Sequence, residues 1–253
     1  MKEQKIALIT GGSRGLGRDM VLRLAAKGID SVFTYHSNES AAKEVIEEVE
    51  KMGQKVKAFQ LDTSQIQGFE AFFEQVSAYL KETYDTPNFD FLINNAGTGI
   101  YRPFAETTEA QFDEMVNIHF KGVYFLTQKA LPHLNDGGRI INISTGLARF
   151  SLPNSSAYAA SKGAVEVLSR HLAKELGNRK IAVNVVAPGA IGTDFGGGAD
   201  KNNAKKREIV GNNTALGRMG EPEDIGGIVA FLCSEDAYWI NGQRIEAAGG
   251  FML

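Results

Sequence analysis

Residues 5–17 read Lys5-Ile6-Ala7-Leu8-Ile9-Thr10-Gly11-Gly12-Ser13-Arg14-Gly15-Leu16-Gly17. An apolar run ends in a turn with glycines at positions 11, 15 and 17, and the amphipathic segment 15–28 follows at once. Such a strand–turn–helix unit lets helix N–H groups approach the phosphates of a dinucleotide. A tight turn without a ligand is the alternative, but the place of the turn, after the first strand and at the first helix, favours dinucleotide binding.

The rest of the chain repeats this arrangement, with short apolar runs alternating with helix-length amphipathic segments. We expect strands at 5–10, 31–35, 56–61, 89–94, 139–143, 182–187 and 244–247. We expect helices at about 15–28, 40–52, 66–83, 109–134, 156–177 and 222–234. Alternation of this kind is typical of a parallel sheet covered on both faces. The sequence therefore predicts an α/β fold, a Rossmann-type doubly wound sheet of about seven parallel strands.

One domain is the simplest organisation for residues 1–253, because no linker, internal repeat or low-complexity run divides them. The longest irregular segment is 193–203, which holds Gly196-Gly197-Gly198. Glycines permit motion, so this segment is a candidate lid within a substrate loop at about 193–215.

Composition excludes several classes of partner and site. The net charge is −3 and the basic residues are dispersed, so we expect no nucleic-acid or anionic membrane surface. No run approaches the ~20 apolar residues that span a bilayer, and the N-terminus leads directly into a strand rather than into a signal peptide. Cys233 is the only cysteine, which excludes an internal disulfide and a cysteine-based metal site. We expect a cytoplasmic protein without a metal.

Tyr158 and Lys162 stand four residues apart in a predicted helix, which places them one turn apart on the same face. A cation beside a phenol favours the phenolate, so the pKa of Tyr158 should fall from about 10 toward working pH. Such a phenol can donate and accept protons. The alternative at this spacing is a ring on the core and a solvated cation.

The end of the second strand bears on the choice between the two nicotinamide cofactors. A carboxylate there holds the ribose hydroxyls and repels a 2′-phosphate. This chain has Thr34-Tyr35-His36-Ser37-Asn38, with no acid until Glu39. Arg14 of the glycine turn and the polar residues 36–38 could receive a phosphate, although they could also be ordinary surface residues. The sequence therefore favours NADP(H) over NAD(H).

Three motifs follow one another in a fixed order: the glycine turn 10–17, Asn94-Asn95-Ala96-Gly97, and Tyr158 followed by Lys162. Together they resemble the short-chain dehydrogenase/reductase family, and the pattern is nearest to NADP-dependent carbonyl and 3-oxoacyl-thioester reductases. The resemblance extends over essentially the whole chain. It implies that Tyr158 is the catalytic acid/base and that Lys162 hydrogen-bonds the nicotinamide ribose.

The glycine turn, the second strand end and the resemblance together give the expected cofactor contacts. Within this set, the resemblance implies that Asp62 contacts the adenine and that residues 188–193 lie beside the nicotinamide. The full set is Gly11, Ser13, Arg14, Gly15, Leu16, Gly17, His36, Ser37, Asn38, Asp62, Thr63, Asn94, Ala96, Gly97, Tyr158, Lys162, Pro188, Gly189, Ile191 and Thr193.

Two catalytic positions depart from the family pattern. Thr145 stands where the family usually has serine, with Ser144 just before it. Neighbours on an extended strand point to opposite faces, so we expect Thr145 to polarise the substrate oxygen unless the strand end shifts by one residue. His119 stands where the family usually has asparagine. Its imidazole, which titrates near neutral pH, could hold a water connected to Lys162, or it could be a packed helix residue.

The resemblance implies an oxidoreductase that transfers hydride between NADP(H) and a carbonyl or secondary alcohol, with Tyr158 as proton donor and acceptor. Two alternatives stay open: an NAD-linked alcohol dehydrogenase of the same fold, and a non-catalytic NADP(H)-sensing or scaffolding protein. The resemblance also suggests a homotetramer or dimer built on helices 109–134 and 156–177. The substrate stays unnamed, although Tyr101, Phe150 and Phe195 suggest an apolar lining.

Overall fold

A computed structural model describes residues 4–198 and 201–253. Its seven strands form one sheet in the order β3-β2-β1-β4-β5-β6-β7, and every neighbouring pair is parallel. The strands are β1 (Ile6–Ile9), β2 (Asp30–Tyr35), β3 (Val56–Gln60), β4 (Phe89–Asn94), β5 (Leu134–Ile143), β6 (Ala182–Pro188) and β7 (Arg244–Ala247). The α/β fold and the seven parallel strands that the sequence predicted are confirmed. The strand order reverses between β1 and β4, and ligands bind at such a switch point, beyond the carboxyl ends of the strands.

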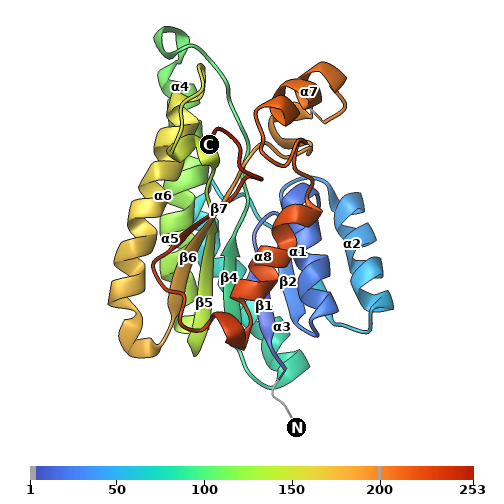
Figure 1. The fold of residues 1–253 in the computed structure, drawn as a ribbon. Coiled ribbons are helices and arrows are strands. Elements are labelled where there is room, and N and C mark those ends of the chain that lie inside the picture. The colour runs from blue at the N-terminus through green and yellow to red at the C-terminus, as the bar shows by residue number, and fades with distance from the viewer. Residues whose placement is uncertain (1–3, 199–200) are drawn as a thin grey trace.

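The helices cover both faces of the sheet (Figure 1). They are α1 (Gly15–Ala26), α2 (Glu39–Lys51), α3 (Phe69–Tyr84), α4 (Glu109–Val116), α5 (Gly122–Ala130), α6 (Ser156–Glu175), α7 (Ala204–Asn212) and α8 (Glu223–Leu232). Successive side chains of β1 divide between two cores, because side chains alternate along a strand. Ala7 and Ile9 join the core under α1, α2 and α8, whereas Ile6 and Leu8 join the core under α3, α5 and α6.

The segment predicted as one helix at 109–134 is interrupted. A π-helical turn, Asn117–Lys121, separates α4 from α5, and β5 already begins at Leu134. Gly122 explains part of this local structure, since a Cβ there would collide with the backbone carbonyl of Thr63 and lie 2.9 Å from that of Asn117. The predicted helix is therefore present from 109 to 130 but contains this π turn, and such turns occur frequently at functional sites.

The candidate substrate loop, 193–215, contains the helix α7, which is not among the six helices expected above. Asn203 begins α7, because its side-chain oxygen accepts a hydrogen bond from the Lys206 backbone N–H. Gly196, Gly197 and Gly198 precede it with φ of 64°, 95° and 74°. Glycine adopts such angles without the steric strain of a side chain. The part of the predicted lid at 199–200 lies outside the described residues.

Within the described ranges, no helix is both long enough and apolar enough to cross a membrane. The same residues contain no group of three or more His, Cys, Asp or Glu side chains that could hold a metal ion.

Candidate active site

The glycine turn is fixed by hydrogen bonds from both neighbouring strands. Thr34 at the end of β2 receives the Gly11 N–H on its hydroxyl at 3.1 Å and the Gly12 N–H on its carbonyl at 2.8 Å. From the end of β4, the Asn95 amide donates to the carbonyls of Thr10 (2.9 Å) and Gly11 (3.0 Å). Asn95 was not among the predicted site residues, although the paired asparagines of the 94–97 motif were the signal for it.

The predicted glycines have distinct roles in this turn. Gly11 and Gly15 have φ of 69° and 53°, and a Cβ on Gly17 would collide with the Gly11 carbonyl. Within the same turn Ser13 is buried, Leu16 packs toward the core beneath α1, and Arg14 is exposed. The backbone of the turn is therefore not covered by side chains where α1 begins, and Arg14 is the exposed basic residue of the turn.

Residues 188–193 meet this turn from the other side of the switch point. A Cβ on Gly15 would lie 3.5 Å from the Thr193 Cβ. Gly189 donates its N–H to Ala247 at 3.1 Å, and Ile191 pairs with Gly220, so this segment is anchored to neighbouring backbone. Pro188, the last residue of β6, leads into it.

The ends of β2 and β3 lie together beyond the glycine turn. The His36 Nε2 lies 3.7 Å from a carboxylate oxygen of Asp62, and the other Asp62 oxygen accepts hydrogen bonds from Ser64. Ser37 is exposed. The Asn38 side-chain oxygen caps α2 by accepting from the Ala41 N–H at 3.0 Å. The side-chain oxygen of Asn38 is therefore occupied by the helix cap.

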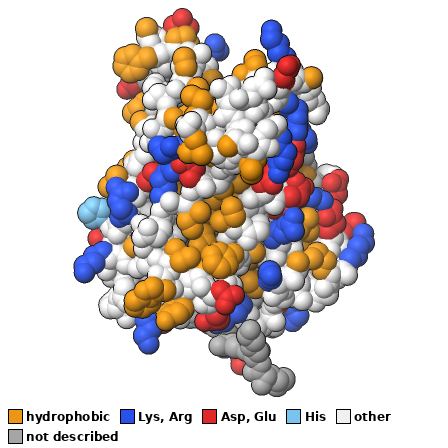
Figure 2. Space-filling model, viewed as in Figure 1, with side chains coloured by type: hydrophobic (Ala, Val, Ile, Leu, Met, Phe, Trp, Pro, Cys, Tyr) orange, Lys and Arg blue, Asp and Glu red, His pale blue; other side chains and the backbone are white. Residues whose placement is uncertain are grey.

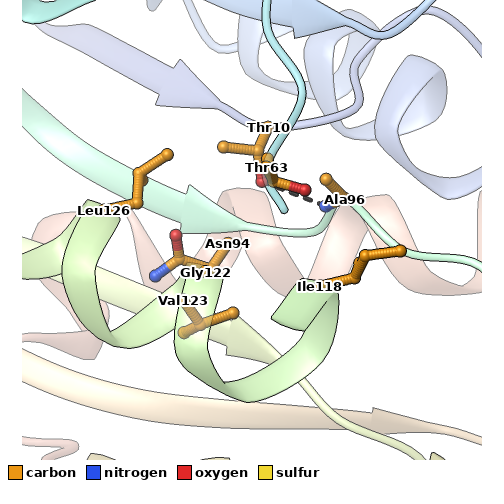
Figure 3. A pocket seen from close by; sticks show the side chains of 8 residues that line it. All are labelled: Thr10, Thr63, Asn94, Ala96, Ile118, Gly122, Val123 and Leu126. Atoms are coloured by element: carbon orange, nitrogen blue, oxygen red, sulfur yellow. Dashed lines mark hydrogen bonds between the residues drawn. The ribbon is translucent and has the colours of Figure 1, made fainter. Parts of the chain in front are cut away.

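Thr63, Asn94 and Ala96 border a cavity of about 10 Å³ behind this edge (Figure 3). It has room for about one water molecule. The Asn94 amide donates to Thr127 (2.9 Å) and to Asn142 (2.7 Å), and the Ala96 N–H donates to the Thr10 hydroxyl at 3.0 Å. Asn94 therefore connects β4 to α5 and β5.

Tyr158 lies on the first turns of α6 with its side chain buried. Its hydroxyl interacts with the side chain of Thr145, just beyond the end of β5. Burial raises the pKa of Tyr158, the ionised form of Tyr101 would raise it further, and the Thr145 hydroxyl lowers it. Two other rings flank the phenol, with the centroid of Tyr101 at 6.5 Å and that of Phe195 at 5.6 Å.

Lys162 follows one turn later and is also buried. Its Nζ donates to the carbonyl of Ile143 at 2.6 Å and lies 5.9 Å from the centre of the Tyr158 ring. Burial lowers the pKa of Lys162 to about 8. The expectation that this cation brings the pKa of Tyr158 below its usual value is wrong for this structure, because burial of the phenol raises that pKa and Lys162 is not among the groups that shift it.

The structure separates the two neighbouring hydroxyls, as strand alternation predicted. The Thr145 side chain faces Tyr158, whereas the Ser144 hydroxyl donates to Glu166 at 2.6 Å. Ser144 is therefore not brought together with Tyr158.

His119 is fully buried in the π-helical turn, and its ring meets that of Tyr158 edge to face at 5.0 Å. The Nε2 lies 2.7 Å from the Thr98 carbonyl. A carbonyl only accepts, so Nε2 carries the proton and Nδ1 is left with a lone pair. Among the described residues this Nδ1 has no hydrogen-bond partner. Burial lowers the pKa of His119 to about 3, with a smaller contribution from the charge of Lys162. The expectation that this imidazole titrates near neutral pH is therefore wrong.

Comparison with known proteins is consistent with this geometry. A family described as enoyl-(acyl carrier protein) reductase matches residues 11–252. The hydroxynaphthalene reductase-like protein Arp2 of Metarhizium brunneum is 37% identical, covering 97% of this chain and 94% of its own. Tetrahydroxynaphthalene reductase PfmaG of Pestalotiopsis fici is 36% identical, covering 97% and 91%. The solved angucycline C-6 ketoreductase LanV with bound NADP has a TM-score of 0.93 at 38% identity, covering 98% and 95%.

Matches over nearly the full length, at this identity, reach from the glycine turn to the last strand. The chain belongs to the short-chain dehydrogenase/reductase family.

Proposed function

We propose that this protein is an NADP(H)-dependent oxidoreductase that interconverts ketones and secondary alcohols, with Tyr158 as proton donor and acceptor. The observation that carries the proposal is the buried Tyr158 side chain, which faces Thr145, with Lys162 one turn away and hydrogen-bonded to the Ile143 carbonyl. The reductase names of the similar proteins support the reaction class. All 253 residues would form one domain for this purpose.

The glycine turn fits a dinucleotide, since no side chain caps the N-terminus of α1 and a Cβ on Gly17 would collide with the Gly11 carbonyl and open the tight turn. The bound cofactor would supply a hydride to the carbonyl carbon. The residues that would hold it are those predicted from the sequence: the turn 11–17, residues 36–38, Asp62, Thr63, Asn94, Ala96, Gly97, Lys162 and the segment 188–193.

The end of β2 favours NADP(H). Arg14 and His36 are exposed there. Glu39, the first acid after β2, is paired with Lys43 at 2.8 Å. A 2′-phosphate would therefore meet cationic or polar groups rather than a carboxylate directed at the ribose. The NADP bound to LanV supports the same choice.

Within the site, the hydroxyls of Thr145 and Tyr158 would both bind the substrate oxygen. Because burial raises the pKa of Tyr158, the phenol is protonated at neutral pH and can give its proton to the forming alkoxide. The opposite reaction requires the phenolate, so alcohol oxidation should become faster as pH rises.

The side chains around Tyr158 favour ketones joined to flat aromatic rings. Tyr101 and Phe195 flank the phenol and are 46% and 37% exposed, so each keeps apolar surface beside the reacting hydroxyl. Both rings also pack over Gly99, where a Cβ would lie 2.8 Å from Phe195 and 3.0 Å from Tyr101. The hydroxynaphthalene and angucycline in the names of similar proteins agree with this substrate class.

His119 would act as a fixed hydrogen-bond acceptor. Its Nδ1 lone pair is buried without a partner among the described residues, and the charge of Lys162 reaches the ring. A water held between Nδ1 and Lys162 would satisfy both groups. This role needs no change in the charge of the imidazole.

A second copy of the chain would cover α4, α5 and α6, forming a dimer or tetramer. These helices lie side by side (Figure 1) and expose Phe112, Tyr124 and Val167 by 46%, 41% and 47%.

Figure 2 shows further hydrophobic side chains on another face, over β7 and α8. Phe231, Tyr238 and Trp239 are among the exposed apolar residues of the segment that includes α8 and leads to β7.

The proposed reaction predicts that Tyr158→Phe reduces 2-tetralone with NADPH at least about 100-fold more slowly, because positioned proton transfer contributes on the order of 10²–10⁴-fold. NADPH should still bind, as measured by its fluorescence, and the parent should use NADPH better than NADH. Turnover by Tyr158→Phe at the parental rate would contradict the role of Tyr158.

The aromatic preference is tested with 2-tetralone and its saturated counterpart, trans-2-decalone. We expect kcat/KM of the parent to favour 2-tetralone by about tenfold, and Tyr101→Leu or Phe195→Leu to reduce this ratio to about twofold through loss of ring–ring contact. Tyr238→Leu, an exposed ring far from Tyr158 along the chain, is the control. Equal kcat/KM for the two ketones in the parent would rule the preference out.

A neutral His119 predicts a specific pH dependence. Because its pKa is about 3, the kcat of ketone reduction should show no histidine titration between pH 5 and 8. His119→Asn should keep kcat within about threefold, since its amide oxygen also accepts a hydrogen bond, and His119→Leu should lower kcat about tenfold. A limb near pH 6.5 that disappears in His119→Asn would show that the imidazole titrates instead.

Sedimentation equilibrium tests the assembly. The parent should have a mass of two or four chains of 27.4 kDa. Val167→Asp should shift the mass toward that of one chain, because a carboxylate would be buried in the interface. Ile209→Asp, an exposed aliphatic residue on α7, serves as the matched control. A parental mass of 27.4 kDa would count against a second copy.

A further inference from the structure

The row of side chains on α6 continues one turn past Lys162. Tyr158, Lys162 and Glu166 stand at positions i, i+4 and i+8, which face the same way on a helix. Each contacts one of three consecutive residues at the end of β5. Lys162 donates to the Ile143 carbonyl, Glu166 accepts from the Ser144 hydroxyl, and Tyr158 interacts with the Thr145 side chain.

Arg244, the first residue of β7, joins this row to the same strand end. Its Nε donates to Glu166 Oε1 at 2.8 Å, and one terminal nitrogen donates to the Thr145 carbonyl at 3.1 Å. The other terminal nitrogen donates to Glu246 at 3.1 Å, and Glu246 in turn is paired with Arg149 at 2.6 Å. The planar guanidinium thus serves three acceptors on three elements, which a lysine ammonium at this place could not reproduce.

The Glu166–Arg244 pair is largely shielded from water, with side chains 12% and 21% exposed. Coulombic attraction and hydrogen bonds are stronger in such surroundings than at the surface. Neither side chain touches the Tyr158 hydroxyl in any contact of the described residues. Their effect on the reaction must therefore pass through residues 144 and 145.

We propose that Glu166 and Arg244 are positioning residues for the reaction, which fix the end of β5 so that Thr145, and not Ser144, presents its hydroxyl to Tyr158. The inference rests on the proposed function. Glu166 occupies the Ser144 hydroxyl, and Arg244 holds the Thr145 carbonyl. Since residues 144 and 145 point to opposite sides of an extended strand, these two contacts determine which hydroxyl reaches the phenol.

Displacement of Thr145 would change the chemistry of Tyr158. The interaction with Thr145 lowers the pKa of this phenol and so favours its phenolate. The other groups facing this phenol are Lys162 on α6, Tyr101 from the segment after β4, and His119 from the π-helical turn. If Thr145 is displaced while these stay in place, the pKa of Tyr158 rises. Alcohol oxidation requires the phenolate, so its kcat rises with pH. The rising limb of this pH profile should move to higher pH.

The test measures kcat for oxidation of 2-tetralol with NADP⁺ from pH 6 to 11, with KM for NADP⁺ and the melting temperature alongside. We expect Glu166→Leu, Arg244→Leu and, for comparison, Thr145→Ala to move the rising limb of the pH profile up by about one pH unit, which lowers kcat on the limb about tenfold. The KM for NADP⁺ should stay within about twofold, because neither side chain belongs to the cofactor residues.

Conservative variants separate positioning from general stability. Glu166→Gln keeps the Oε1 acceptor for both Ser144 and Arg244, so its limb should stay near that of the parent. Arg244→Lys keeps the charge but fewer of the hydrogen bonds, so its limb should lie between those of the parent and Arg244→Leu. Glu70→Leu, which removes the exposed Glu70–Lys129 pair, should leave the limb unchanged.

Folded Glu166→Leu and Arg244→Leu proteins with the parental limb would overturn the inference, even if their melting temperatures fell. Should either leucine variant fail to fold, an unshifted limb in Arg244→Lys overturns it equally. A limb that persists in Tyr158→Phe would instead overturn the proposed function.

Discussion

Desolvation at the end of β5 governs the chemistry of this site. Tyr158, Lys162 and His119 are all buried within a few residues of the sheet edge. Burial disfavours the charged form of each, so it raises the pKa of the phenol and lowers those of the ammonium and the imidazole. A buried polar group without a partner is costly, and Lys162 and His119 are each held in place by a hydrogen bond to a backbone carbonyl.

The sheet supplies the partners. The carbonyl of Ile143 fixes Lys162, and the side chain of Thr145 faces Tyr158, both from the end of β5. The same edge, two strands away, carries the glycine turn, tied down by Thr34 from β2 and Asn95 from β4. Because parallel strands all end at this edge, Tyr158 and the glycine turn come together although they are far apart in sequence.

The sequence was sufficient where the determinant is local. Short apolar runs predicted the seven strands. The family resemblance indicated Thr145, and alternation along the strand predicted that Ser144 points the other way. Prediction from the sequence failed where a tertiary contact determines the local structure. The π-helical turn accompanies the packing of Gly122 against Thr63, 59 residues earlier, and the Arg244 contact to Thr145 spans 99 residues. The pKa of Tyr158 was misjudged for the same reason, because depth of burial is a property of the whole fold.

The histidine at position 119 illustrates how one replacement is accommodated by its surroundings. A Cβ on Gly97 would lie 2.7 Å from the His119 ring, so the imidazole fits only because residue 97 has no side chain. The ring proton is used by the Thr98 carbonyl, which fixes the tautomer and leaves the lone pair on Nδ1. Burial then keeps the ring neutral. A residue that normally changes charge near neutral pH thereby becomes a fixed acceptor, which is what an asparagine oxygen would also provide.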